Sequence, residues 1–255
     1  MRISWWGHAT TTIELGAVRV LTDPVLTERI AHLRRHGSAP PPPESVGADV
    51  VLVSHLHADH LHVPSLRMLA APTRIIAPAG AARLLARAAP ELATRVEEVE
   101  AGESVRVGDV EITAVPAHHD GRRHGVSRFH APALGYVLRR DDRSVWFAGD
   151  TGLFDGLDAI GPVDVAVVPV GGWGPTLGPH HLDPEQAAEA VGRVGAHDAV
   201  PVHYGTFWPA GLRHLSTGQF EHKFRRPGDR FATALRQSDV DAIAHVLAPG
   251  RAVTL

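Results

Sequence analysis

The chain has 255 residues, of which 44% are hydrophobic and 21% charged, and its formal net charge of -3 gives no electrostatic case for binding nucleic acid or an anionic membrane. It contains no cysteine, which excludes disulfides and thiolate metal sites, so a metal ion would have to be held by nitrogen and oxygen atoms. The sequence has neither a signal-peptide core nor a stretch of membrane-spanning length, which predicts a cytoplasmic protein with no membrane span.

The first part of the chain is rich in short apolar runs that predict β-strands. They occupy residues 3–6, 11–15, 18–22 and 50–53. Between them, residues 25–46 are irregular and include a stiff polyproline stretch at 40–43, a pattern typical of either a linker or a loop. Because the strands on both sides are needed for one sheet, we expect a loop beside the polar site described next.

Four metal-binding side chains follow the apolar run 50–53, namely His55, His57, Asp59 and His60. In an extended backbone successive side chains alternate, so His55 and His57 should project to the same side at the end of the strand. Imidazoles and a carboxylate form a ligand set suited to zinc, manganese or iron. A chain with 18 histidines could produce such a cluster by chance, but candidate ligands recur after later strands.

The rest of the chain alternates predicted strands with predicted helices. Gly108-Asp109 predicts a hairpin, and Asp183 followed by Pro184 predicts the N-cap and first residue of a helix. Further strands are expected at residues 74–77, 96–99, 104–107, 110–115, 134–138, 144–148, 164–169, 199–202 and 252–255. Helices are expected at residues 64–70, 79–89 (ended by Pro90), 184–193 and 227–237.

The spacing His-x-His-x-Asp-His at residues 55–60 resembles the signature of the metallo-β-lactamase fold superfamily. Residues 115–120, 146–152 and 200–207 resemble the family's remaining metal motifs, in the same order along the chain. With Trp6-Gly7-His8-Ala9-Thr10 and Leu21-Thr22-Asp23-Pro24, they are similar to the branch that contains the ascorbate-phosphate lactonase and the N-acyl-phosphatidylethanolamine-hydrolysing phospholipase D. The resemblance spans residues 3–207, and it is specific for the fold and metal site but weak for the substrate.

The resemblance implies an α/β (α+β) fold: a four-layer αβ/βα sandwich in which two mixed β-sheets pack face to face with helices outside. It implies a single hydrolase domain over residues 1–255, with the site at one edge between the two sheets. On the family's pattern, one metal would be held by His55, His57 and His119, the other by Asp59, His60 and His203, and Asp150 would bridge both.

The implied cofactors are two divalent metal ions, zinc or manganese, with iron also compatible with these ligands. Two neighbouring cations lower the pKa of water and stabilise a bridging hydroxide, so we expect a binuclear hydrolase acting on a phosphodiester, lactone or other ester. Asp59, Asp150 and His181 are the residues expected to act in catalysis. The substrate would be a small molecule, phosphorylated or not, and a homo-oligomer is compatible with the sequence.

Several positions near these motifs have two interpretations. His118 and His119 compete for one ligand position, and the family's spacing after the proline favours His119. His181 is either a proton donor to the leaving group or a structural histidine before a helix. His8 and Asp23 each follow a predicted strand, and we expect them to orient metal ligands from behind.

Arg122 and Arg123 either neutralise an anionic substrate group or lie in a solvated loop, and the loop is favoured. His62 departs from the family pattern, since many relatives carry there an aspartate that pins the neighbouring ligand. Residues 205–226 predict either a lid over the site or ordinary core packing, and core packing is preferred slightly. The aromatic residues of this segment are Phe207, Trp208, Phe220 and Phe224.

Two other classes of function compete with hydrolysis. A di-iron oxidoreductase can use the same fold, but no flavin-binding domain accompanies this chain. A non-catalytic metal- or ligand-binding module is the other alternative. A degenerate relative of that kind is expected to have lost at least one metal ligand, whereas all seven positions are filled here.

Overall fold

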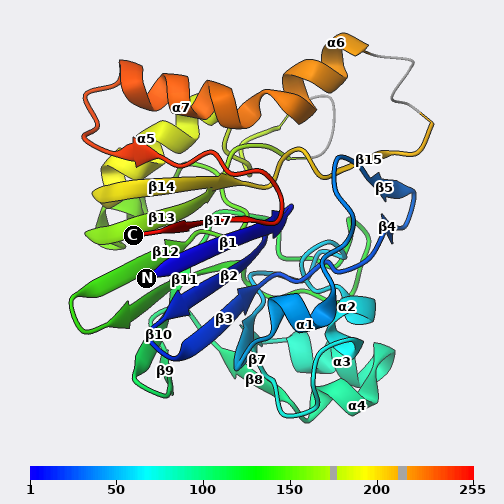
Figure 1. The fold of residues 1–255 in the computed structure, drawn as a ribbon. Coiled ribbons are helices and arrows are strands. Elements are labelled where there is room, and N and C mark those ends of the chain that lie inside the picture. The colour runs from blue at the N-terminus through cyan, green and yellow to red at the C-terminus, as the bar shows by residue number, and fades with distance from the viewer. Residues whose placement is uncertain (173–176, 212–216) are drawn as a thin grey trace.

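The computed structural model describes residues 1–172, 177–211 and 217–255, and two seven-stranded sheets dominate it (Figure 1). In spatial order, the first sheet contains β17 (Arg251–Thr254), β1 (Arg2–Gly7), β2 (Thr10–Leu15), β3 (Val18–Thr22), β6 (Val50–Leu52), β7 (Arg74–Pro78) and β8 (Val96–Val99). The second contains β16 (Ile243–Ala244), β14 (Ala196–Val202), β13 (Val163–Pro169), β12 (Arg143–Phe147), β11 (Leu134–Arg140), β10 (Val110–Pro116) and β9 (Ser104–Val107).

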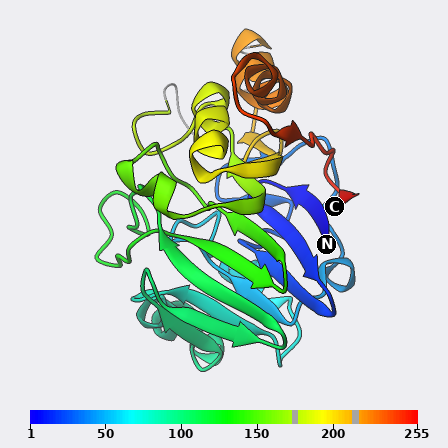
Figure 2. The ribbon, with the colours of Figure 1, turned by 90° about the vertical axis from the view of Figure 1, so that its left-hand side faces the viewer.

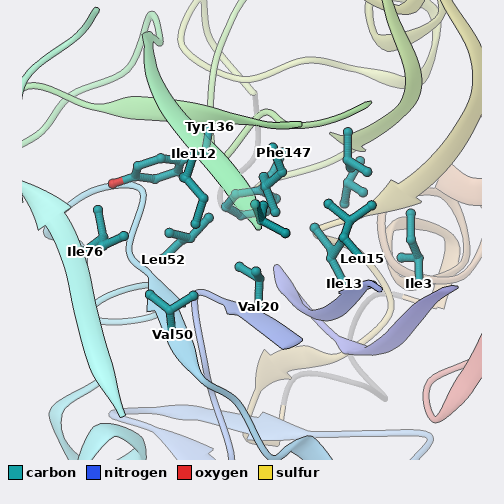
Figure 3. Close-up of a cluster of buried hydrophobic side chains, with 14 of the residues drawn as sticks. Ile3, Ile13, Leu15, Val20, Val50, Leu52, Ile76, Ile112, Tyr136 and Phe147 are labelled. Atoms are coloured by element: carbon teal, nitrogen blue, oxygen red, sulfur yellow. The ribbon is translucent and has the colours of Figure 1, made fainter. Parts of the chain in front are cut away.

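The two sheets face each other and bury a common apolar core (Figures 2 and 3). Strand β6 shows how the sequence builds it, because its side chains alternate between two clusters. Val50 and Leu52 lie in the core between the sheets, whereas Val51 and Val53 lie on the outer face, against the helices. A strand that is buried on both faces needs an uninterrupted apolar sequence, which is why residues 50–53 contain no polar residue.

Helices cover the outer face of each sheet, which completes four layers (Figure 2). Leu66 and Leu85 pack on the first sheet, and Val191 and Phe231 pack on the second. The predicted four-layer sandwich is therefore confirmed. On the first sheet lie α2 (Val63–Arg67), α3 (Ala81–Ala88) and α4 (Pro90–Ala93), and on the second lie α5 (Pro184–Val194) and α7 (Pro227–Gln237). The remaining elements are α1 (Pro43–Val46), α6 (Thr217–Phe220), a 3-10 turn (Asp155–Ala159) and a π-helical turn (Glu221–Arg225).

Local signals placed six of the eight ends of the predicted helices within one residue of the observed ends. Asp183 caps α5, since its side chain accepts a hydrogen bond of 2.7 Å from the main-chain nitrogen of Gln186. Pro90 was predicted only to end a helix, but it also opens α4. Proline lacks the N–H that a helix interior needs, yet it fits the first turn, where that N–H has no partner. None of the described helices is long and apolar enough to cross a membrane.

Residues 25–46 form a crossover between the parallel strands β3 and β6, so they are not a linker between separate units. The crossover contains β4 (Arg29–Ile30) and β5 (Leu33–Arg35), which were not predicted and which join β15 (Phe207–Pro209) in a three-stranded sheet. Val25 and Leu33 pack with Ala58, which lies among the candidate ligands. The crossover therefore lies beside the site, as expected.

The strand directions bring the candidate ligands to one edge. Strands β1, β3 and β6 run parallel to one another, as do β10, β12, β13 and β14 in the second sheet. The carboxyl ends of these strands therefore share one edge in each sheet. The main-chain nitrogen of His203, after β14, donates a hydrogen bond of 2.9 Å to the oxygen of His8, after β1, so the two edges meet.

Candidate metal centre

All seven predicted metal ligands come together where the two edges meet. Four strands supply them: the loop after β6 carries His55, His57, Asp59 and His60, and β10, β12 and β14 are followed by His119, Asp150 and His203. Their ligand atoms form four overlapping groups, within each of which all atoms lie within 4.8 Å of one another. The groups are His55-His57-His119, His8-Asp59-His60-His203, His55-His60-Asp150 and His119-Asp150-His181.

Three imidazole nitrogens converge in the first group. His57 Nδ1 lies 2.9 Å from His55 Nε2 and 3.1 Å from His119 Nε2. The other nitrogen of His119, Nδ1, lies 2.8 Å from the main-chain oxygen of His180. Because a carbonyl oxygen can only accept, we assign the proton of His119 to Nδ1. Its Nε2 therefore presents a lone pair to the other two imidazoles.

The same reasoning fixes the tautomer of His55. The hydroxyl of Ser54 donates to Asp23 Oδ2 at 2.6 Å, so it can only accept from His55 Nδ1 at 2.9 Å. His55 Nε2 then also presents a lone pair. Two lone pairs directed at one small volume repel each other unless a proton or a cation lies between them, so this donor set fits a metal ion.

The second group has the same character. His60 Nδ1 donates to Asp23 Oδ2 at 2.7 Å, and His203 Nδ1 donates to the main-chain oxygen of Gly171 at 3.1 Å. Because Nδ1 of each ring is engaged in this way, Nε2 of each ring faces inward, and the two Nε2 atoms lie 3.3 Å apart. Asp59 Oδ2 lies 3.8 Å from His60 Nε2. The neutral form of each ring again offers a lone pair to a cation.

Asp150 lies between the first group, which contains His119, and the second, which contains His60 and His203. Its Oδ2 lies 3.3 Å from His60 Nε2 and 3.9 Å from His119 Nε2, and its Oδ1 lies 3.2 Å from His203 Nε2. Oδ1 is buried and has no hydrogen-bond partner. A buried carboxylate oxygen without a partner is costly, and a cation in front of it removes that cost.

Burial and charge set the ionisation of the centre. Burial lowers the pKa of His57 to about 4 and that of His203 to about 3, which keeps both imidazoles neutral and ready to bind a metal. Burial also lowers the pKa of His60, but the carboxylates of Asp150, Asp23 and Asp59 together outweigh burial and hold that pKa well above its usual value. Burial raises the pKa of Asp150, but the imidazoles of His203, His60 and His119 together reverse this and hold that pKa well below its usual value. The site thus attracts positive charge.

A shell of buried polar residues orients the candidate ligands, as predicted for His8 and Asp23. Asp23 accepts from His60 and from Ser54, and His8 Nε2 donates to Asp59 Oδ2 at 3.1 Å. The sequence reasoning missed Ser54, because a serine after a strand has no distinguishing signal. His8, Asp23 and His203 all have positive φ, at 53°, 34° and 64°. Residues other than glycine rarely adopt this backbone conformation, and those that do are concentrated at functional sites.

The structure separates the two neighbouring histidines after β10. The imidazole of His119 lies within the first group, whereas His118 is exposed and its ring packs 4.8 Å from that of His180. The main-chain nitrogen of His118 donates to the hydroxyl of Thr151 at 2.9 Å, which fixes this turn next to the Asp150 loop.

His181 lies closer to the ligands than its position before α5 suggested. Its Nδ1 donates to the main-chain oxygen of Leu177 at 3.0 Å, and its Nε2 lies 3.7 Å from Asp150 Oδ2. Its ring packs against Gly172, where a Cβ would lie only 2.7 Å from the ring carbon Cδ2. The side chain is 19% exposed, so a substrate can reach it from solvent. Residues 173 and 174 of the preceding glycine-rich loop lie outside the described residues.

The two adjacent arginines have different environments, and neither matches its predicted role fully. Arg122 is an exposed loop residue, as favoured, but it is paired with Asp120 through contacts of 2.7–3.1 Å. The favoured solvated-loop interpretation is wrong for the side chain of Arg123, which is partly buried. Its guanidinium donates instead to the main-chain oxygens of Leu56 and Leu61.

His62 does not reproduce the aspartate of the relatives. Its Nδ1 lies 2.7 Å from the hydroxyl of Ser65 in the first turn of α2, and burial lowers its pKa to about 4. That hydroxyl also accepts a hydrogen bond of 2.7 Å from the main-chain nitrogen of Leu26. His62 therefore anchors the start of α2 to the crossover.

The described aromatic residues of segment 205–226 pack mainly on one another. Trp208 lies 5.2 Å and 5.7 Å, between ring centroids, from Phe220 and Phe224. Phe207 is buried, with Arg35 over its face and the His8 ring at its edge. These contacts match the core-packing interpretation, and residues 212–216 lie outside the described part of the chain.

Comparisons with known proteins agree with this geometry. Residues 18–204 match the beta-lactamase superfamily domain. A metal-dependent hydrolase of Methanopyrus kandleri is 34% identical over 215 residues, which cover 82% of this chain and 86% of that protein. An N-acyl-phosphatidylethanolamine-hydrolyzing phospholipase D of Caenorhabditis elegans is 29% identical over 226 residues, covering 80% of this chain and 64% of that one.

The fold has a solved counterpart in a metallo hydrolase of Ignicoccus hospitalis, with a TM-score of 0.71 and 20% sequence identity over 99% of this chain and 97% of that one. At this identity the likeness concerns the fold alone. The domain match covers most of the chain, and the Methanopyrus relative aligns over most of both proteins. The chain therefore belongs to the beta-lactamase superfamily.

Proposed function

We propose that this protein is a binuclear metal-dependent hydrolase. The observation that carries the proposal is the convergence of imidazole lone pairs in two groups, with the buried Asp150 carboxylate between them. Relatives named metal-dependent hydrolases support the same class of activity. One ion would be held by His55, His57 and His119, the other by Asp59, His60 and His203, with Asp150 contacting both.

The protein's own groups have separable tasks in such a centre. When bound, divalent ions would generate a nucleophile from water at neutral pH and stabilise charge on a carbonyl or phosphoryl oxygen. Asp150 fixes the separation of the two ligand groups, and Asp59 is held in place by the hydrogen bond from His8. His181 Nε2 faces the centre and the side chain is partly exposed, so in its protonated form it can donate a proton to a leaving oxygen.

We propose that the substrate is a small molecule with a phosphodiester, lactone or other ester bond. The phospholipase D relative, whose name specifies a phosphodiester substrate, supports the first of these. A screen of the metal-loaded protein with bis-p-nitrophenyl phosphate, a series of lactones and simple nitrophenyl esters tests the assignment. Hydrolysis of none of them, together with bound iron, would instead favour the oxidoreductase alternative.

The protein loaded with zinc or manganese should hold about two ions per chain. The seven candidate ligand residues offer imidazole nitrogens and carboxylate oxygens, and none is a thiolate, so both metals suit the site. Elemental analysis after removal of free metal measures the number. Loading should also raise the melting temperature, because a ligand that binds only the folded state stabilises it. Less than half an equivalent after reconstitution with either metal would contradict a binuclear centre.

Replacing His119 with alanine should remove about one bound ion per chain, whereas replacing His118 should remove none. The two residues are neighbours, but only the His119 ring reaches the other candidate ligands. His118→Ala is therefore the matched control, and its effect on stability should be small because the side chain is exposed. Elemental analysis of both variants measures the outcome, and metal loss in the His118 variant alone would mean that the ligand assignment is wrong.

A further inference from the structure

Arg123 points inward from the loop that follows His119 and reaches the segment that carries four candidate ligands. Its Nη1 lies 2.8 Å from the main-chain oxygen of Leu56 and 2.7 Å from that of Leu61. The two carbonyls lie at either end of residues 57–60. One guanidinium nitrogen therefore bridges both ends of the turn that presents three of these ligands, His57, Asp59 and His60.

The loop that carries Arg123, residues 121–131, is itself held closed, and we call it the strap. Its ends are joined by a hydrogen bond of 3.1 Å from the nitrogen of Ala131 to the oxygen of Gly121. A Cβ at Gly121 would lie 1.6 Å from the oxygen of Ala131, so only glycine permits this approach. The nitrogen of Arg123 donates to the oxygen of Phe129 at 3.0 Å, which fixes the point from which its side chain extends.

The strap begins two residues after the candidate ligand His119, and Arg123 ends on residues 56 and 61. The strap and Arg123 therefore connect His119, which follows β10 in the second sheet, to the ligand turn that follows β6 in the first sheet. Hydrogen bonds from a charged donor are shorter and stronger than those between neutral groups, so a guanidinium is well suited to hold two carbonyls at a fixed separation.

We infer that Arg123 is a positioning residue that sets the metal affinity of the centre by fixing residues 56–61 relative to His119. This inference rests on the proposed function, since it assigns the ligands to a metal site. Groups that orient metal ligands without touching the metal change affinity or activity by roughly 10- to 100-fold when removed. Arg123 should have an effect of this size through the backbone of the ligand turn.

The adjacent Arg122 provides a matched control. It belongs to the same strap, carries the same charge and is engaged with Asp120 at the surface. Arg123→Met keeps the apolar stem but removes the donors, and Arg123→Lys keeps the charge and can restore part of the bridge. Metal affinity is measured for the folded protein by competition with a chelator for zinc. We expect Arg123→Met to bind zinc roughly 10- to 100-fold more weakly, Arg123→Lys to lie between, and Arg122→Met to match the wild type.

Hydrogen exchange on the metal-free proteins provides a second readout that needs no metal. In this turn the nitrogens of His60 and Leu61 donate to the oxygen of His57 at 3.1 Å and 2.9 Å. These two amides should exchange faster in Arg123→Met than in the wild type or Arg122→Met. If Arg123→Met does not fold, Arg123→Lys is compared with the wild type instead, and we expect a smaller loss of zinc affinity and of amide protection.

The possible outcomes separate the inference from the proposed function. Unchanged zinc affinity in Arg123→Met, even with a lower melting temperature, would show that Arg123 is merely structural. Unchanged exchange at His60 and Leu61 would equally overturn the inference. If the wild type and the Arg122 control bind no metal, the proposed metal centre fails, and the exchange measurement alone then decides whether Arg123 fixes the turn.

Discussion

Alanine in place of Asp150 should abolish hydrolysis while leaving the fold intact. The carboxylate lies within 4 Å of His60, His119, His181 and His203, so it contacts both ligand groups. Without it the two groups lose their shared ligand, and a metal pair loses its fixed separation. Loss of one hydrogen-bond donor to a developing charge costs about a hundred- to a thousandfold in kcat, and we expect a loss of at least about a thousandfold here.

The stability of the metal-free protein should fall little, because a buried carboxylate oxygen without a partner costs free energy in the folded state. Asp150→Asn keeps the volume of the side chain but removes its charge, so it separates packing from electrostatics. Calorimetric unfolding of the metal-free proteins and hydrolysis of bis-p-nitrophenyl phosphate by the loaded proteins measure both effects, provided that the wild type turns this compound over. A rate near that of the wild type in either variant would refute the bridging role.

Replacing His181 with alanine should lower the rate by roughly two to four powers of ten while both metals stay bound. Its Nδ1 donates to the main-chain oxygen of Leu177, and its Nε2 lies 3.7 Å from Asp150 Oδ2. A proton donor at this position matters most for a poor leaving group, whose oxygen is strongly basic if it departs without a proton. A nitrophenolate needs little protonation, so the loss should shrink for nitrophenyl substrates.

The rates of the His181 variant are therefore compared on an alkyl ester and a nitrophenyl ester of the same acid, with metal content checked in parallel. His197→Ala is the control, because that histidine is exposed and lies in β14 at the end opposite to His203. Equal losses on both esters would mean that His181 does not protonate the leaving group. An unchanged rate on both would make it a structural histidine, and loss of metal would make it a ligand.

Much of the architecture followed from local sequence patterns. The strand at residues 18–22 and the helix at residues 227–237 have the predicted bounds, because apolar periodicity and proline position act over a few residues. The clustering of the candidate ligands was also predictable. His119, Asp150 and His203 each follow a strand, and parallel strands deliver their carboxyl ends to one edge. The ligand roles within that cluster stay a prediction.

Other features depended on contacts between residues far apart in the sequence. Strands β4, β5 and β15 are two or three residues long, and β5 pairs with a segment more than 170 positions away, so no local pattern marks them. Arg122 and Arg123 are identical neighbours in the sequence. Only the closure of the strap sends one to Asp120 at the surface and the other to the ligand turn.

The sequence by itself determined which side chains gather at the centre, because residue type and strand position are written in it. Only the tertiary structure decided which nitrogen of each imidazole faces inward. Main-chain oxygens of His180, Gly171 and Leu177 make that choice for His119, His203 and His181. Every residue carries the same carbonyl group, so no sequence pattern can tell which of them will meet a given ring.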